Sequence, residues 1–299
     1  MSILVVGSVA MDTIKTPFGE AQDLLGGSAT YFSIAASLFD RVNLVGVVGK
    51  DMPEDRLQVL GSRDIDLSGL LLKDGLTFRW EGEYQEDLNT RRTINLQLNV
   101  FEGFKPRIPE DFAASPYVFL ANMDPDIQMD VLGQVTSPRL VACDTIDFWI
   151  ETKRGPFLEL LKKVDILILN EQEARALSGE LNLPLAIRWI SERGPRMVVV
   201  KKGAHGVLMF ANESYFATPA YPLEKVFDPT GAGDSFAGGF LGYLARKGTI
   251  DEESLRLAVV YGSVLASFCV EDFGVERLAQ VEPDQMEARF NDFKELARF

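Results

Sequence analysis

Histidine and cysteine are scarce in this chain of 299 residues, which has one His and two Cys. Two cysteines, Cys143 and Cys269, cannot form a disulfide framework or a zinc site, and both lie in apolar runs typical of buried thiols. The single histidine, His205, stands beside glycines in a predicted surface turn. These shortages exclude disulfide scaffolds and histidine-clustered metal sites.

Positive charge is also in short supply, because 30 Lys and Arg residues face 44 Asp and Glu residues, a formal net charge of −14. This balance argues against nucleic acid or an anionic membrane surface as the main partner. No segment approaches the roughly 20 apolar residues of a membrane span. Residues 1–7 have neither a basic region nor a long apolar stretch. We therefore expect an acidic, soluble, cytoplasmic protein.

Short apolar runs rich in β-branched residues alternate with longer helical patterns. The strand candidates are residues 3–6, 42–48, 117–120, 140–143, 166–169 and 197–200. This alternation predicts an α/β fold of three layers, doubly wound, with a mostly parallel sheet. Polar residues follow each run, among them Asn122, Asp144 and Asn170, and we expect them to converge on one crevice beyond the carboxyl ends of the strands.

Residues 77–100 break this alternation with a period of two. One predicted face carries Phe78, Trp80, Tyr84, Ile94, Leu96, Leu98 and Val100, and the other carries Arg79, Glu81, Glu83, Thr93, Asn95, Gln97 and Asn99. The pattern predicts a long hairpin whose apolar face covers substrate, packs on a second copy, or both. A hairpin packed on the protein's own core is the alternative. No repeat, low-complexity tract or linker is visible, so we predict a single domain over residues 1–299.

The most informative run is residues 228–240, D-P-T-G-A-G-D-S-F-A-G-G-F. Gly231 and Gly233 permit backbone angles and close ligand approach that a side chain would block. An apolar helical pattern follows, so the glycines are predicted at a helix N-terminus, where backbone N–H groups and the helix dipole attract anions. Asp234 falls in the first turn, where it could take a proton from a hydroxyl that attacks phosphorus. A plain glycine-rich helix cap is the alternative.

This run resembles the C-terminal signature of the PfkB (ribokinase-like) carbohydrate kinases, D-T-x-G-A-G-D-x-F, with Pro229 at the D-T junction. Gly26-Gly27, Asn170-x-x-Glu173 and Gly203-x-x-Gly206 extend the resemblance over nearly the whole chain. It implies ATP-dependent phosphorylation of a hydroxyl on a sugar, nucleoside or related small polyol, with Mg²⁺ required and use of a monovalent cation left open. It also implies a ribokinase-like small β lid, formed by about residues 12–22 and 77–100.

The resemblance assigns roles to individual residues. Asp234 matches the catalytic base, and the amides of Gly231, Ala232 and Gly233 match the anion hole. Glu173 matches the residue that organises the water shell of Mg²⁺, which prefers oxygen ligands, although an N-x-x-E pair can also be only a capping box. The substrate-binding candidates are Asp12, Gly26, Gly27, Tyr31 and Asn122, and the nucleotide-binding candidates are Asn170, Lys201, Gly203, Gly206, Thr230 and Gly274.

The sequence departs from the family pattern at two of these positions. Ribokinases proper have G-G-K-G-A-N where this chain has G-G-S-A-T-Y, so Tyr31 replaces Asn and ribose itself becomes doubtful as the acceptor. Lys201 replaces the usual Thr of the nucleotide turn, so a cation substitutes for a hydroxyl. Arg91 and Arg92 are the only paired cations in the lid, which disfavours a phosphorylated acceptor.

Other nucleotide-binding signatures are missing. Residues 7–12 (GSVAMD) lack the dinucleotide pattern, and residues 46–51 (GVVGKD) lack the P-loop spacing. A non-catalytic sugar or nucleotide sensor on the same fold is the remaining alternative, and it would have no need of Asp234. The apolar lid face also predicts a homodimer that forms through the lid.

Overall fold

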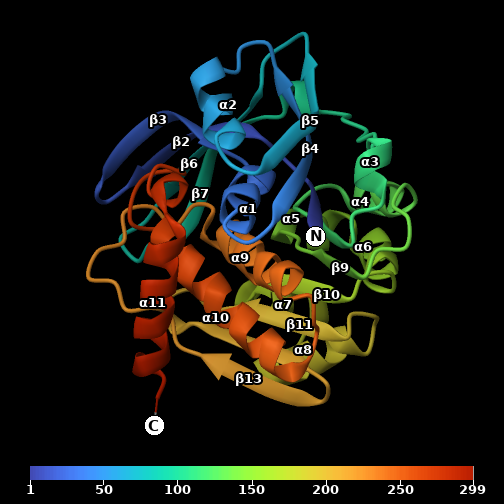
Figure 1. The fold of residues 1–299 in the computed structure, drawn as a ribbon, viewed down its shortest axis with the longest axis vertical. Coiled ribbons are helices and arrows are strands. Elements are labelled where there is room, and N and C mark those ends of the chain that lie inside the picture. Colours follow the sequence, from blue (N-terminus) through green and yellow to red (C-terminus); the bar gives the residue numbers. More distant parts are fainter. Residues whose placement is uncertain (299) are drawn as a thin grey trace.

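The computed structural model describes residues 1–298 and contains two β-sheets (Figure 1). The large sheet runs, from one edge to the other, through β13 (Ser214–Thr218), β12 (Val207–Ala211), β11 (Met197–Lys201), β10 (Ile166–Asn170), β9 (Leu140–Cys143), β8 (Tyr117–Leu120), β1 (Ser2–Val6), β4 (Arg41–Gly49) and β5 (Ile65–Lys73). The strands from β11 to β5 are parallel, and β12 and β13 add an antiparallel edge.

Helices cover both faces of the large sheet (Figure 1). One face packs on α1 (Ser28–Ala36), α2 (Glu54–Gly61), α9 (Ala232–Lys247), α10 (Glu252–Cys269) and α11 (Pro283–Leu296). The other face packs on α3 (Glu110–Ala113), α4 (Pro125–Leu132), α5 (Asp147–Thr152), α6 (Arg154–Leu161), α7 (Glu171–Ser178) and α8 (Leu183–Ser191). The three-layer α/β fold predicted from the sequence is confirmed.

The strands of the large sheet are continuous apolar runs because both faces of this sheet are buried. Ile3 and Val5 of β1 enter the core beneath α1 and α9, whereas Leu4 and Val6 enter the opposite core. Successive side chains of a strand point to opposite faces, so a strand covered on both sides needs an apolar residue at every position. All six predicted strands are present, each within one residue of its predicted ends.

The sequence patterns missed three strands: the two edge strands β5 and β13, and β12, which pairs with β13. β5 leaves Leu71 and Leu72 47% and 57% exposed, because no neighbour covers its outer side. β12 and β13 form a hairpin through Asn212 and Glu213, which both have positive φ angles, 50° and 58°. Such two-residue turns usually carry Asn-Gly or Asp-Gly, so the turn signal was weak here.

The segments predicted to form a lid lie in the second sheet, whose strands are in the order β3 (Gly19–Gly26), β2 (Ala10–Thr16), β6 (Phe78–Tyr84) and β7 (Arg91–Gln97), and which appears at the upper left of Figure 1. Its first hairpin extends beyond the predicted 12–22 at both ends. Residues Asn99–Phe101 form a 3₁₀ turn, so Val100 does not lie on the strand as predicted.

A β-bulge corrects the predicted faces of the lid hairpin. Glu81 pairs with Asn95 but Gly82 pairs with Thr93, which leaves Ile94 as an extra residue. Thr93 therefore joins the face of Trp80, whose Nε1 donates to Thr93 Oγ1 at 3.2 Å. Apolar residues of the predicted face remain accessible on β7, where Ile94 is 47% and Leu96 53% exposed, and Leu98, just after the strand, is 39% exposed.

Within residues 1–298 no helix has the combination of length and apolar character that crossing a bilayer requires. Cys143 and Cys269 are both buried free thiols, and His205 lies on the surface, as predicted.

Candidate active site

The carboxyl ends of neighbouring strands bring polar residues into one row. Lys201 and Asn170 end β11 and β10, Asp144 follows β9, and Asn122 follows β8 by two residues. Because β11, β10, β9 and β8 are adjacent and parallel, their ends meet at one edge of the sheet. Asp234, in the first turn of α9, lies near enough to Asp144 and Lys201 for these two residues to influence its pKa.

The loop before α9 is shaped by Gly231 and braced by Asp228. Gly231 has φ 73°, in the left-handed region, and a Cβ there would lie 2.3–2.4 Å from the ring of Tyr31. Asp228 is fully buried, and its two carboxylate oxygens accept hydrogen bonds from Thr230 N at 2.8 Å and Gly274 N at 2.9 Å. The predicted nucleotide residues Thr230 and Gly274 are therefore tied to the same carboxylate.

Free backbone donors remain at this helix start. No side chain caps α9, and the N–H groups of Gly231 and Gly233 have no backbone acceptor among residues 1–298. The Ala232 N–H donates to Pro229 O at 3.3 Å, so two of the three predicted anion-hole amides are unengaged. A helix N-terminus with free N–H groups binds anions.

Asp234 is partly accessible, although protein surrounds it. Loss of hydration raises its pKa to about 6, against the opposing effect of the Lys201 charge. A carboxylate that titrates just below neutral pH is suited to act as a general base.

Two cations face this carboxylate without a partner. Neither Lys201 nor Arg91 forms an ion pair with any other described residue. The Lys201 Nζ lies beside Gly233, 2.6 Å from where a Cβ would stand. Arg91, on the lid, stacks over the Trp80 ring at 5.5 Å and lowers the pKa of Asp234.

The carboxyl of Asp12, on strand β2, lies against the backbone of the glycine pair Gly26-Gly27. A Cβ on Gly26 would lie 1.9 Å from Asp12 Oδ2, and the Gly27 backbone donates to the Asp12 carboxyl. Gly27 itself has φ 96°, and a Cβ at this position would lie 2.4 Å from the carbonyl oxygen of Ser8. Burial and the charge of Asp228 raise the pKa of Asp12 to about 8.

The other two substrate candidates have different surroundings. Tyr31 is 1% exposed, with its ring under Gly231 and its hydroxyl without a partner among the described residues, so it supports the loop from behind. Asn122 Oδ1 accepts a hydrogen bond from Trp149 Nε1 at 3.0 Å. An indole N–H is only a donor, so this contact fixes the amide and leaves Asn122 Nδ2 free to donate.

Asn170 and Glu173 form a capping box at the start of α7. Glu173 N donates to Asn170 Oδ1 at 2.8 Å, and Asn170 N donates to Glu173 Oε2 at 2.7 Å. Within residues 1–298 nothing donates to Glu173 Oε1, and burial raises the pKa of Glu173 to about 7. No cluster of three or more His, Cys, Asp or Glu side chains could hold a metal among these residues. A metal that keeps its waters and binds phosphates, such as Mg²⁺, fits this donor set.

The lid contacts the loops on both sides of this cluster. Thr230 Oγ1 donates to the hydroxyl of Tyr84 at 3.1 Å, and a Cβ on Gly203 would lie 3.0 Å from Asn89 Oδ1 at the hairpin tip. Gly206, the last residue of the nucleotide motif, is buried. The predicted lid therefore touches both glycine-containing loops at Thr230 and Gly203.

Comparison with known proteins identifies the family. The family model described as "pfkB family carbohydrate kinase" matches residues 2–280. The chain belongs to the PfkB family of carbohydrate kinases. It is therefore a phosphotransferase that acts on a sugar or nucleoside, and the kinases of this family use ATP.

Several relatives of this PfkB kinase are named for nucleosides. It is 31% identical to a cytidine kinase of Thermococcus kodakarensis over 269 residues, 87% of this chain and 94% of the relative. It is 28% identical to a nucleoside kinase of Methanocaldococcus jannaschii over 258 residues, 86% and 82% of the two chains.

Solved structures show the same fold. The crystal structure of a Methanocaldococcus jannaschii nucleoside kinase, described as an archaeal member of the ribokinase family, superposes with TM-score 0.77 at 23% identity over 97% of this chain and 98% of that one. A putative ribokinase II from E. coli, in complex with ATP and Mg²⁺, superposes with TM-score 0.80 at 16% identity over 97% and 99% of the two chains.

Three residues of this PfkB kinase lie in the cluster although sequence reasoning gave them no role: Asp144, Tyr84 and Arg91. Asp144 was among the polar residues that follow strands, so its place at the strand ends was predicted but its proximity to Asp234 was not. Tyr84 and Arg91 were parts of the hairpin pattern, and only the pairing of Tyr84 with Arg91 places both at its active-site end.

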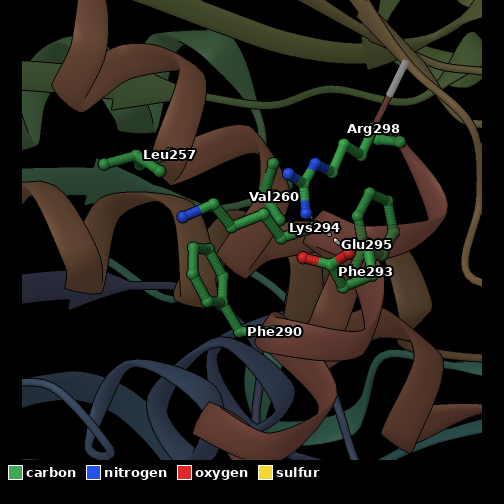
Figure 2. Close-up of a pocket in the computed structure, with 8 residues that line it drawn as sticks. Leu257, Val260, Phe290, Phe293, Lys294, Glu295 and Arg298 are labelled. Carbon is green, nitrogen blue, oxygen red and sulfur yellow. Dashed lines mark hydrogen bonds and ion pairs between the residues drawn. The ribbon is translucent and has the colours of Figure 1, made fainter.

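A separate cavity of about 640 Å³ lies between α10 and the end of α11 (Figure 2). Leu257, Val260 and Phe290 line it together with charged residues of the last helical turns. None of these residues belongs to the candidate active site of the kinase.

Proposed function

We propose that this protein transfers the γ-phosphoryl group of ATP to a hydroxyl of a nucleoside, sugar or related small polyol, with Asp234 as the base. The observation that carries this proposal is the position of Asp234. It lies in the first turn of a helix at whose start the N–H groups of Gly231 and Gly233 are free, beside a lysine that has no ion-pair partner among the described residues. A base, anion donors and a free cation around one point are the groups that phosphoryl transfer requires.

In this mechanism Asp234 accepts the proton of the attacking hydroxyl. The amides of Gly231 and Gly233, with Ala232 between them, stabilise the negative charge that develops on the transferred group. Lys201 and Arg91 add positive charge from the sheet and from the lid. A chain with a net charge of −14 leaves these two cations unpaired where a polyphosphate would lie.

ATP would lie along the crevice from Asn170 past Gly203 and Gly206 to Thr230 and Gly274, and Mg²⁺ would be held through its waters by Glu173. When bound, the metal would neutralise phosphate charge. The capping box holds one carboxylate oxygen of Glu173, and the other oxygen is free. Because the first oxygen is held, the free oxygen has a fixed direction. Use of a monovalent cation remains a prediction of the family resemblance.

Among acceptors we favour a nucleoside, between the lid and Gly26 and Gly27. The names of the relatives support this class. Asp12 is suited to two neighbouring hydroxyls, as on a ribose ring. Asn122 offers a fixed amide donor, which would recognise a carbonyl or ring nitrogen of a base.

The test is an ATP-consumption assay with Mg²⁺ and a panel of nucleosides, sugars and polyols. We expect turnover of at least one nucleoside, and Asp234→Asn should lower kcat by about 10²–10⁴ while ATP binding persists. Asp130→Asn is the matched control, because Asp130 is an exposed aspartate with no side-chain partner. Near-normal kcat in Asp234→Asn would reject the base, and binding of ATP without turnover of any compound would favour a sensor.

The proposal also covers the oligomeric state and the location of the protein. Ile94 and Leu96 on the lid edge strand, with Leu98 just after it, leave an apolar strip, and we propose that a second copy covers it in a homodimer. We also propose that the protein acts in the cytoplasm on a small molecule, and that it has no nucleic-acid or membrane partner.

A further inference from the structure

Trp80 lies on the face of the second sheet that is turned toward the candidate active site. Residues paired directly across neighbouring strands share a face, and Trp80 of β6 pairs with Asp12 of β2. The carboxyl of Asp12 lies against Gly26. Tyr84, four residues after Trp80 and on the same face, accepts a hydrogen bond from Thr230 Oγ1 at 3.1 Å. This face is therefore directed at the proposed acceptor and nucleotide sites.

The indole ring of Trp80 is held in place by its neighbours on this face. A Cβ on Gly82 would lie 2.1 Å and 2.2 Å from Cη2 and Cζ2 of the ring, so the ring fills the space above a glycine inside the strand. Its Nε1 donates to Thr93 Oγ1 at 3.2 Å, and the Arg91 guanidinium lies 5.5 Å from the ring centroid. The indole is therefore a preformed flat surface, and it remains partly accessible.

An acceptor held by Asp12 has one accessible large neighbour across the strands of this face. Asp12 pairs with Leu24 on one side and with Trp80 on the other. Leu24 is 7% exposed and packs beside Gly274, whose Cβ would lie 3.3 Å from it. Trp80 is only one strand spacing, about 5 Å, from Asp12. In a nucleoside the base is bonded to the carbon next to the one that carries the 2′-hydroxyl, so ribose hydroxyls at Asp12 would bring the base within reach of Trp80.

We propose that Trp80 is a specificity-determining residue, whose indole ring stacks on the base of a nucleoside acceptor. This inference rests on the proposed function and deepens its assignment of the acceptor. Every nucleobase has a flat π-face, and stacking on an aromatic side chain is favourable for all of them. A ring that is already held in place loses little rotamer freedom when a ligand binds. Trp80 therefore favours nucleosides over sugars and polyols, which have no planar ring.

The kinetic test compares Trp80→Phe, which keeps a planar ring, with Trp80→Leu, which keeps only apolar bulk. The probes are cytidine, uridine, adenosine and guanosine, with ribose as the probe without a base. Trp80→Leu should raise KM for the nucleoside that turns over by about 5- to 100-fold, with kcat and KM for ATP little changed. Trp80→Phe should retain most of the affinity. Glu81→Gln is the matched control, because Glu81 is the next residue of β6 and lies on the opposite face.

Fluorescence separates this inference from the proposed function, because it needs no turnover. The chain has three tryptophans, and a nucleoside titrated without ATP should quench the emission of the unmodified protein, whereas ribose should not. The quenching should be largely lost in Trp80→Phe although that variant still binds. Quenching by a nucleoside that is not phosphorylated would support the role of Trp80 and reject the proposed phosphoryl transfer.

Four outcomes would overturn the inference. They are quenching that persists undiminished in Trp80→Phe, no quenching by any of the four nucleosides, an unchanged KM in Trp80→Leu, and an equal rise of KM in both Trp80 variants. If Trp80→Leu alters sedimentation and leaves KM unchanged, the ring belongs to the contact between two copies. Turnover of sugars without quenching by any nucleoside would reject stacking on Trp80 and leave Asp234 as the base.

Discussion

Alanine at Gly231 and alanine at Gly233 should damage the protein in different ways, although the two glycines are two residues apart. A Cβ at Gly231 would meet the ring of Tyr31 at 2.3–2.4 Å, and Tyr31 is fully buried and cannot move aside. A Cβ at Gly233 would meet only the Nζ of Lys201, the far end of a flexible side chain, at 2.6 Å.

The backbone angles increase the difference in stability expected between the two variants. Gly231 has φ 73°, where a side chain costs about 1–2 kcal/mol, and forcing a methyl against a packed ring costs about 1–3 kcal/mol more. Gly231→Ala should therefore lower the free energy of unfolding by about 2–5 kcal/mol. Gly233 is helical, where alanine is favoured over glycine by about 0.5–1 kcal/mol. Gly233→Ala should therefore be at least as stable as the unmodified protein.

The Gly233 variant should keep its stability but lose activity. Gly233→Ala displaces the Lys201 ammonium and crowds the amide donor, and loss of one such donor costs about 10²–10³ in kcat. Urea denaturation followed by tryptophan fluorescence measures the stabilities, with an unchanged slope required for comparison. A Gly231→Ala variant with normal stability would refute the placement of Tyr31 under the loop. Normal turnover by Gly233→Ala would show that these amides point elsewhere.

Three further predictions concern the metal, the buried carboxyl of the lid and the lid edge. Glu173→Gln keeps the capping box but lacks a charge, so it should raise the Mg²⁺ concentration for half-maximal rate without lowering stability; an unchanged Mg²⁺ titration would leave Glu173 only its capping role. The pKa of Asp12 is raised to about 8 in the folded protein, so the folded state holds a proton that the unfolded state has lost, and stability should fall as pH rises from about 4 to about 8, by up to about 1.4 kcal/mol per pH unit. Urea midpoints across this range should fall less steeply for Asp12→Asn, and parallel curves would contradict the burial of that carboxyl. Leu96→Asp should dissociate the proposed dimer and raise KM more than it lowers kcat; sedimentation of the unmodified protein as a monomer at micromolar concentration would eliminate the dimer.

The sequence predicted the parts of the fold in which local pattern and tertiary packing agree. The central strands are apolar at every position because helices cover both of their faces, so 117–120 and 140–143 were predicted with their exact ends. The helix start at Gly231 was equally visible, since glycine, glycine and aspartate are spaced as an anion-binding turn needs. Edge strand β5 was missed because it lies at the rim of the sheet, where only Ile65 is buried and a continuous apolar run is not required.

The bulge at Ile94 shows a limit of local pattern. An alternating sequence implies one face for each residue, but an extra residue in one strand moves Thr93 to the other face, and only pairing with Glu81 and Gly82 reveals it. Leu96 and Leu98 were expected to be covered by substrate or by a second copy, and in the single chain they are exposed.

By itself the sequence determined the α/β class, the central strands, the hairpin and the glycine-rich helix start, because these depend on period, composition and short-range spacing. Tertiary structure alone decided which side chains meet at the carboxyl ends of the strands. Asp144, Lys201 and Asp234 come from three elements far apart in the chain, and strand order brings them within reach of one another. Their protonation and charge depend on loss of hydration and on neighbouring charges, which exist only once the chain has folded.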